Sequence, residues 1–220
     1  MGGYAVAAYG VPRYSVDVDI VVPTSAREQW ISWLRTHGLT RKQAYRSPAT
    51  EIHHVEVQRW QRGYVTLDLM VGGVRDRDSR VTIPDEWLLR SPRSVQLNLL
   101  SGSLASPVVV VRLEGLWATK LLAGRPHDIS DLFGIMSQEV DLGEIRKLFE
   151  GFSGELALRK FRRTSNNVRD RQTYVDSLSR LLRGSPEDPK NLARWKHFVK
   201  MVSDALPSAG REHGSSAPKI

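Results

Sequence analysis

Residues 14–22, YSVDVDIVV, alternate apolar and polar side chains along almost their whole length. Successive side chains of a β-strand point to opposite faces of the sheet. One face of this segment is apolar or aromatic throughout and comprises Tyr14, Val16, Val18, Ile20 and Val22. The opposite face comprises Ser15, Asp17, Asp19 and Val21. The segment therefore predicts a strand that buries its apolar face and presents two carboxylates, roughly 7 Å apart, on the other.

Two neighbouring carboxylates on one strand repel each other, and a divalent cation between them removes that penalty. Carboxylate oxygens are hard ligands that suit Mg²⁺ or Mn²⁺, ions that also bind substrate phosphates. The pair Asp17 and Asp19 thus indicates a metal site. The alternative is that both side chains merely line the solvent face of an antiparallel sheet.

A β-hairpin is predicted further along, from residues 53–60, HHVEVQRW, and residues 64–71, YVTLDLMV, joined by a Gly-containing loop at residues 61–63. Asp68 is an isolated carboxylate in the second, strongly apolar strand. Strands of one sheet lie about 4.8 Å apart. If this strand neighbours the acidic one, Asp68 completes a three-carboxylate site for two metal ions, of the kind that supports in-line phosphoryl displacement.

The rest of the first half is typical of a mixed α/β domain. Residues 4–10 predict a short helix closed by Gly10, and a second helix is expected from Thr24 or Ser25 to about His37, with Trp30, Trp33 and Leu34 on its buried face. Further strands are predicted at residues 94–100 and 107–112. Helices then follow at residues 113–123, 128–138 and 142–152 and continue to about Val202. The resulting division is a catalytic core at 1–112, a helical C-terminal domain at 113–203 and a disordered tail at 204–220.

The charge of the chain favours a polyanionic partner. The formal net charge is +8, and residues 159–183 are especially rich in Arg and Lys; such a surface attracts nucleic acid or nucleotides, although a solvated helix face explains it equally well. The absence of cysteine excludes disulfides, thiolate zinc sites and a cysteine nucleophile. No apolar run approaches the roughly 20 residues that span a bilayer, so no membrane contact and a cytoplasmic location are predicted.

Residues 2–22 carry a resemblance to a known group. Gly2–Gly3, the acid-x-acid strand with Asp17 and Asp19, and a third acid at Asp68 resemble, in the same order, the signature of the polymerase-β-like nucleotidyltransferase superfamily. The glycines are expected to let the backbone approach a triphosphate closely. In the superfamily a helix usually precedes the Gly-Gly, whereas here only Met1 does; either the natural start lies upstream or one wall of the pocket is missing.

A second segment narrows the resemblance. Residues 112–132, RLEGLWATKLLAGRPHDISDL, resemble the helical region of the AbiEii/MenT-type, toxin-like branch of that superfamily. The matching positions are Glu114, Lys120, Arg125, Asp128 and Asp131. The resemblance, which covers roughly residues 2–135, implies that Lys120 holds nucleotide phosphates and that Asp128 and Asp131 position Lys120, Arg125 or the nucleotide.

The expected fold is α/β (α+β): a small, mixed, mostly antiparallel sheet with flanking helices, followed by a helical domain, with the site between them. The resemblance implies transfer of a nucleoside monophosphate from an NTP, such as ATP, to an acceptor hydroxyl, with two Mg²⁺ (or Mn²⁺) ions. Asp17, Asp19 and Asp68 are the expected metal ligands and catalytic residues. The expected nucleotide-binding residues are Gly2, Gly3, Arg13, Ser15, Lys120, Asp128 and Asp131.

The acceptor is left open by the sequence. The basic helices and the toxin-like resemblance favour RNA, with a tRNA 3′ end as one candidate, and an antitoxin protein as a partner. Transfer to a small molecule or to a protein hydroxyl is the alternative among enzymes. A catalytically silent nucleic-acid-binding module with the same fold is the alternative from another class.

Overall fold

The computed structural model of the chain describes residues 1–11, 15, 17–48, 53–96, 98–99, 102–103, 107–152 and 154–207. The elements of the first half are α1 (Gly2–Ala8), β1 (Asp17–Val22), η1 (Thr24–Ala26), α2 (Arg27–Thr36), β2 (Thr40–Arg46), β3 (Glu56–Arg62), β4 (Val65–Val71), β5 (Gly73–Arg75), β6 (Thr82–Pro84), α3 (Asp85–Leu88), β7 (Arg93–Val95), β8 (Asn98–Leu99), β9 (Gly102–Ser103) and β10 (Val108–Val110). The second half contains α4 (Leu113–Ala123), α5 (Pro126–Ile135), α6 (Leu142–Glu150), α7 (Glu155–Arg169), α8 (Arg171–Arg180) and α9 (Pro189–Ala205).

The main sheet has four strands in the order β1-β4-β3-β2. Strands β4, β3 and β2 pair antiparallel, whereas β1 pairs with β4 in parallel. The predicted α/β fold with a mixed, mostly antiparallel sheet is therefore confirmed. This parallel pair places β1 directly beside β4, although α2, β2 and β3 separate the two strands in the sequence.

The predicted hairpin is confirmed as β3 and β4, but its loop is wrong by two residues. Arg62 pairs with Val65, so that β3 extends two residues further than expected, β4 begins one residue later, and Gly63 and Tyr64 form the turn. Gly63 has φ +57°, a conformation that glycine adopts without steric cost and that two-residue hairpin turns require.

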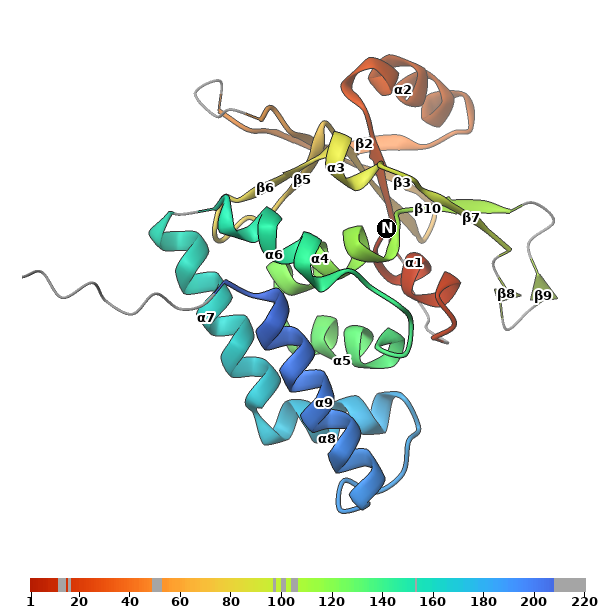
Figure 1. Cartoon of the computed structure of the whole chain (residues 1–220). Coiled ribbons are helices and arrows are strands. Elements are labelled where there is room, and N and C mark those ends of the chain that lie inside the picture. Colours follow the sequence, from red (N-terminus) through yellow and green to blue (C-terminus); the bar gives the residue numbers. More distant parts are fainter. Residues whose placement is uncertain are drawn as a thin grey trace, which may run out of the picture.

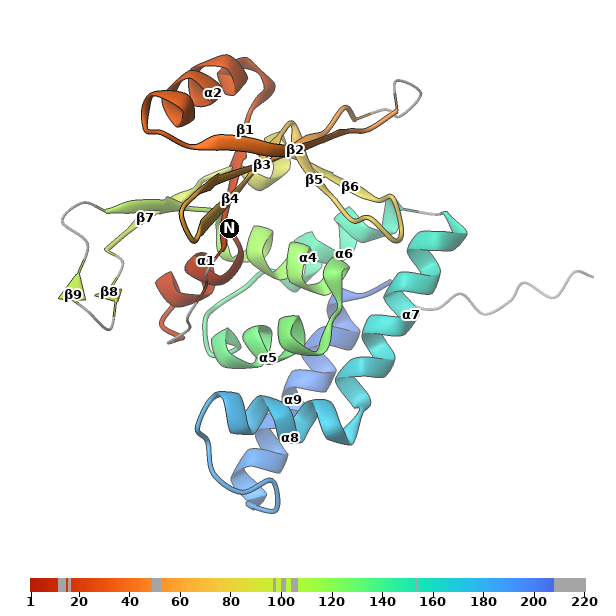
Figure 2. The same cartoon turned by 180° about the vertical axis from the view of Figure 1, so that it is seen from behind.

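Helix α2 covers one face of the sheet, and α1, α4 and the C-terminal helices lie on the other (Figure 1), an arrangement that the view from behind shows equally (Figure 2). The α2 face is held by a small cluster in which Ile31 and Leu34 pack with Trp60, Leu67 and Leu69. Val18, Ile20 and Val22 join this cluster, as the alternation in the sequence predicts.

Two expectations for α2 are wrong. Thr24 lies in the short 3₁₀ turn η1, and no side-chain hydrogen bond caps the helix, which begins at Arg27. Trp33 is 48% exposed and stacks on the imidazole of His37, with ring centroids 4.0 Å apart. The buried stripe passes instead through Ile31 and Leu34, which face the sheet.

The larger core joins α1, β10 and the C-terminal helices. Phe133 of α5 contacts Trp195 of α9 with ring centroids 4.9 Å apart, and Trp195 lies 5.3 Å from Phe198. Helix α4 has the predicted bounds and is buried on all sides, as expected for a helix with apolar residues around its whole circumference. The core takes residues from both sides of position 112, so that the proposed domains share it.

Strands β7 and β10 form a separate antiparallel pair and correspond to the strands predicted at 94–100 and 107–112, although both are shorter. Helix α9 continues to Ala205, two residues into the segment expected to be a tail. It does so because Ala205 and Leu206 are buried in the core. The remainder of that predicted tail, from residue 208 onward, lies outside the described residues. None of the helices in the described part of the chain is long and apolar enough to cross a membrane.

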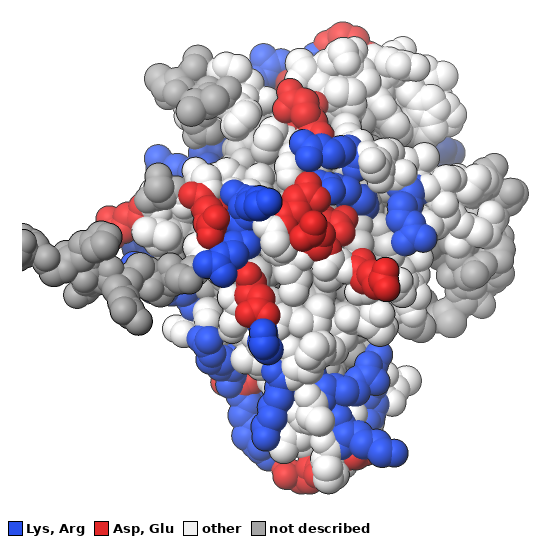
Figure 3. Space-filling view, viewed as in Figure 1, with Lys and Arg blue, Asp and Glu red and all other residues white. Residues whose placement is uncertain are grey.

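Helices α7, α8 and α9 carry the basic surface, which Figure 3 shows over the lower lobe of the molecule. Its exposed residues are Arg159, Arg162, Arg163, Arg169, Arg171, Arg180, Lys190, Arg194, Lys196 and Lys200. Two members of the basic run at 159–183 do not belong to this surface. Lys160 is buried against the β5–β6 hairpin, where Nζ lies 2.9 Å from Asp78, and Arg183 is half-buried over the ring of Phe133.

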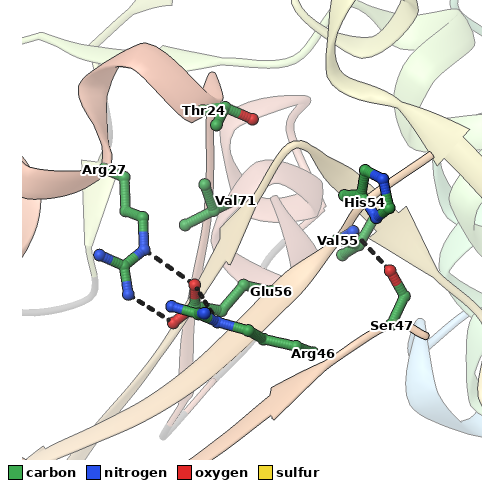
Figure 4. A pocket seen from close by; sticks show the side chains of 8 residues that line it. All are labelled: Thr24, Arg27, Arg46, Ser47, His54, Val55, Glu56 and Val71. Carbon is green, nitrogen blue, oxygen red and sulfur yellow. Dashed lines mark hydrogen bonds and ion pairs between the residues drawn. The ribbon is translucent and has the colours of Figure 1, made fainter. Parts of the chain in front are cut away.

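An ion-pair cluster fastens the start of α2 to β3 and β2, beside a cavity of about 450 Å³ (Figure 4). Arg27 donates to both oxygens of Glu56, at 2.8 and 2.9 Å, and Arg46 donates to one of them at 3.0 Å. Hydrogen bonds from Arg27 hold the pKa of Glu56 at about 2, below its ordinary 4.5, against the opposing effect of burial.

Glu56→Gln is expected to lower the free energy of unfolding by about 2 kcal/mol at pH 7. Because the folded state depresses the pKa of Glu56, its contribution is complete above pH 4.5 and is lost as the pH falls towards 2. The difference between the variant and the wild type in urea unfolding should therefore shrink between pH 5 and about pH 2.

Glu28→Gln is the matched control, because Glu28 also pairs with Arg27 but its side chain is 79% exposed, against 10% for Glu56. Exposed ion pairs contribute about 0–1 kcal/mol. Equal losses in the two variants, or a Glu56→Gln deficit that does not change with pH, would show that the ionised carboxylate of Glu56 is not the source of the stability.

Candidate active site

The two acidic strands lie side by side in the sheet. Strands β1 and β4 pair in register, so that Asp19 stands opposite Asp68 and Asp17 opposite Thr66. In-register partners of a parallel pair point to the same face of the sheet. Asp17, Asp19 and Asp68 therefore share the face that is turned towards α1 and α4, away from α2.

The N-terminal end of α1 lies directly against Asp19. A Cβ atom at Gly2, whose φ is +59°, would lie 1.8 Å from Oδ2 of Asp19, which is closer than any real contact. The backbone nitrogen of Met1 also donates to the carbonyl oxygen of Asp19, at 2.6 Å. The close approach explains why a glycine stands at position 2.

Burial raises the pKa of Asp19 above its ordinary value. The negative charges of Asp68 and Asp17 act in the same direction, and the positive charges at the amino terminus and at Lys120 oppose them. The ionised form of Asp19 is therefore unfavourable in the folded protein, and a cation bound beside it would stabilise that form.

Asp68 is bound by an arginine that the sequence analysis did not single out. Arg59 of β3 stands in register with Asp68 and donates from Nε at 2.8 Å and from Nη2 at 2.6 Å, one bond to each carboxylate oxygen. The hydrogen bonds to Asp68 raise the pKa of Arg59. The loop expected at residues 61–63 pairs Trp60 with Tyr64 and would therefore place Glu56 opposite Asp68; only the observed two-residue turn brings Arg59 there.

The residues of the second motif form a buried network behind this face. Lys120 donates to Asp128 and to Asp131, at 2.7 Å each, and Arg125 donates to the other oxygen of Asp128, also at 2.7 Å. Asp128 is fully buried, and although burial opposes it, the charge of Lys120 and the hydrogen bonds of Arg125 lower the pKa of Asp128. The positive charge of Lys120 also lowers the pKa of Asp19.

The remaining predicted site residues differ in position. Gly3 is buried in α1, and the hydroxyl of Ser15 donates to the carbonyl oxygen of Asp17 at 2.9 Å, just before β1. Arg13 lies outside the described residues. A cavity of about 760 Å³ begins beside Asp19 and runs between α1, the outer edge of β1 and β10; apart from Asp19, its walls are mostly apolar, with Tyr4 and Trp30 among them.

The chemistry of these side chains suits a hard divalent cation, because three carboxylates stand on adjacent strands and one of them is crowded by like charge. Among the described residues, no three Asp, Glu or His side chains are arranged so as to hold an ion. In this arrangement Asp68 directs both of its oxygens to Arg59. The types of side chain fit a divalent cation, but their present arrangement does not form a three-carboxylate site.

Sequence comparison defines the class of this protein. The model of the nucleotidyltransferase AbiEii toxin family, of type IV toxin–antitoxin systems, matches residues 1–213. The chain belongs to this family and is a nucleotidyltransferase of a toxin–antitoxin system.

Comparison with solved structures adds little. The crystal structure of JHP933 from Helicobacter pylori is similar over 90% of this chain and 79% of its own, with 14% identity and a TM-score of 0.35. A second structure, described as a candidate nucleotidyltransferase from H. pylori, covers 90% and 82% with 14% identity and a TM-score of 0.32. Likeness at these TM-scores is too slight to bear on the site. No curated protein matches the chain.

Proposed function

We propose that the protein transfers a nucleoside monophosphate from an NTP to an acceptor hydroxyl, with release of pyrophosphate. The observation that supports this most strongly is the register of β1 and β4, which sets Asp19 beside Asp68 on the face that carries Asp17 and looks towards Lys120. In this proposal the three carboxylates hold two Mg²⁺ or Mn²⁺ ions. When bound, such ions neutralise the charge that develops on the phosphoryl oxygens.

The protein side chains then have distinct tasks. Asp68 accepts the proton of the acceptor hydroxyl as general base. An ammonium has three N–H donors; two of those on Lys120 bind Asp128 and Asp131, and we assign the third to a phosphate oxygen. Gly2, Gly3 and Ser15 bring the backbone close to the triphosphate, and Arg13 is assigned to the same group.

The apolar cavity beside Asp19 is the proposed place of the nucleobase. Its volume of about 760 Å³ lies in the range of small-molecule sites, and Tyr4 and Trp30 offer aromatic surface to a flat ring. The division into a catalytic core and a helical domain at residue 112, with the site between them, belongs to the same proposal.

The proposed acceptor is RNA. The exposed Arg and Lys residues of α7, α8 and α9 form a positive surface over the lower lobe of the molecule (Figure 3). Phosphate contacts of this kind give sequence-independent affinity that falls with salt. A tRNA 3′ end is the specific candidate; direct contact with the antitoxin and a cytoplasmic location remain predictions.

Incubation of the full chain with Mg²⁺, each labelled NTP in turn and total RNA tests the proposal. Label that enters RNA with the wild type, but not with Asp17→Ala or Asp19→Ala, supports it. Label that enters a small molecule or a protein instead would show that this molecule, and not RNA, is the acceptor. Absence of transfer to any acceptor, with salt-sensitive RNA binding intact in the same variants, would identify a silent binding module.

Gly2→Ala is expected to reduce transfer at least about tenfold, because the new methyl group would displace the carboxylate of Asp19. Gly10→Ala is the matched control: Gly10 has φ +91°, but a Cβ there meets no atom within 4 Å. Both variants should lose about 1–2 kcal/mol of stability through backbone strain. Equal transfer rates in the two variants would show that the approach of α1 to Asp19 is unimportant for the reaction.

A further inference from the structure

Arg59, Asp68 and Asp19 form a row across three strands of the sheet. Arg59 stands in register with Asp68, and Asp68 in register with Asp19, so that all three side chains lie on one face. A single carboxylate thus lies between a permanent cation on one side and the proposed metal ligand Asp19 on the other. Asp68 is therefore placed to bind either Arg59 or a cation held at Asp19.

The present arrangement favours the arginine. The guanidinium occupies both oxygens of Asp68, at 2.8 and 2.6 Å, in the two-pronged geometry that Arg and carboxylate share. In this state the described residues contain no group of carboxylates that could hold an ion. Tight metal binding therefore requires at least one oxygen of Asp68 to give up its hydrogen bond to Arg59.

The exposure of the two side chains indicates which of them yields. Both residues lie on inner strands of the sheet, but the side chain of Arg59 is 42% exposed, whereas that of Asp68 is 15% exposed. A displaced guanidinium can remain hydrated, and ion pairs open to solvent are weak. A divalent cation at Asp19 can therefore take over the carboxylate without leaving a buried, unpaired charge.

We propose that Arg59 is a latch on the metal site: it holds Asp68 in the resting protein, and a divalent cation displaces it. Arg59 then sets the cation concentration at which the site fills and is a positioning residue rather than a catalytic one. This inference rests on the proposed function, because it takes Asp19 and Asp68 as metal ligands.

A titration of the whole chain with Mn²⁺ tests the latch without any measurement of activity. Electron paramagnetic resonance gives the concentration of free Mn²⁺ at each point and hence the affinity. Arg59→Gln should tighten Mn²⁺ binding by about fivefold. Arg59→Lys should also tighten it, although less, because lysine keeps the charge but lacks the fork that engages both oxygens. In an Asp68→Asn background, Arg59→Gln should have little effect, since the latch has lost its carboxylate.

The outcomes separate the latch from the proposed function. If Asp19→Asn does not weaken Mn²⁺ binding, the proposed metal site itself is wrong. If Asp19→Asn weakens it while Arg59→Gln and Arg59→Lys leave it unchanged or weaken it, only the latch is wrong. A gain from Arg59→Gln that persists in the Asp68→Asn background, with Arg59→Lys like the wild type, would show a simple effect of charge and also overturn the latch.

Discussion

Asp19→Asn is expected to abolish nucleotide transfer and, at the same time, to stabilise the fold. Loss of one of the proposed metal ligands should cost about 4 kcal/mol of transition-state stabilisation, or roughly a thousandfold in kcat/KM. The stability gain follows from burial, which raises the pKa of Asp19 and so makes its ionised form unfavourable in the folded state. Asparagine has the same shape without the charge, and thermal unfolding at pH 7 should show a higher Tm.

The pH dependence provides a second check. Because the folded state raises the pKa of Asp19, the wild type is penalised above that raised value and recovers as the pH falls towards 3.8, where the carboxyl group becomes protonated in both states. The stability advantage of Asp19→Asn should therefore be greatest near neutral pH and should disappear in acid. Asp17→Asn should lose transfer to a similar extent. A variant at position 19 that is inactive and unfolded would contradict the prediction.

Lys120→Met is expected to reduce both stability and transfer. The ammonium is buried and binds two buried carboxylates, so that its removal takes away a cation from Asp128 and Asp131 together. Breaking a buried pair in this way costs about 3–5 kcal/mol. Where the variant can be kept folded, at low temperature, transfer should fall by about a hundredfold or more, since the proposed phosphate ligand is gone.

Two further variants separate the structural and the functional part of this effect. Lys120→Met combined with Asp131→Asn should recover part of the lost stability, because one uncompensated charge is removed, but none of the transfer. Lys160→Met is the matched control: Lys160 is buried as well and contacts Asp76, which is 13% exposed, and Asp78, which is 66% exposed. Because only one of its two carboxylate partners is buried, it should cost less stability than Lys120→Met and leave transfer intact. Wild-type stability of Lys120→Met in urea unfolding would refute the account of the network.

Local patterns predicted much of the secondary structure correctly. The bounds of helix α4 follow from the sequence, because apolar residues recur around its whole circumference and Gly124, which adopts φ +60°, marks its end. The apolar face of β1 was correct because alternation along a strand is a local property. Errors arose where neighbours decide burial: Trp33 has the helical spacing of a core residue, but α2 turns Ile31 and Leu34 towards the sheet instead.

The sequence by itself determined that Asp17 and Asp19 share one strand face and that Asp128 and Asp131 lie on one side of a helix, because both statements follow from the geometry of a single element. Only the tertiary structure decided that β1 lies parallel to β4 and that Asp68 stands beside Asp19, since pairing between distant strands depends on the packing of the whole sheet. It also decided that Arg59 binds Asp68 and that Lys120 is buried between two carboxylates. Charge–charge contacts of this kind depend on which surfaces the hydrophobic core brings together, and no local pattern in the chain records them.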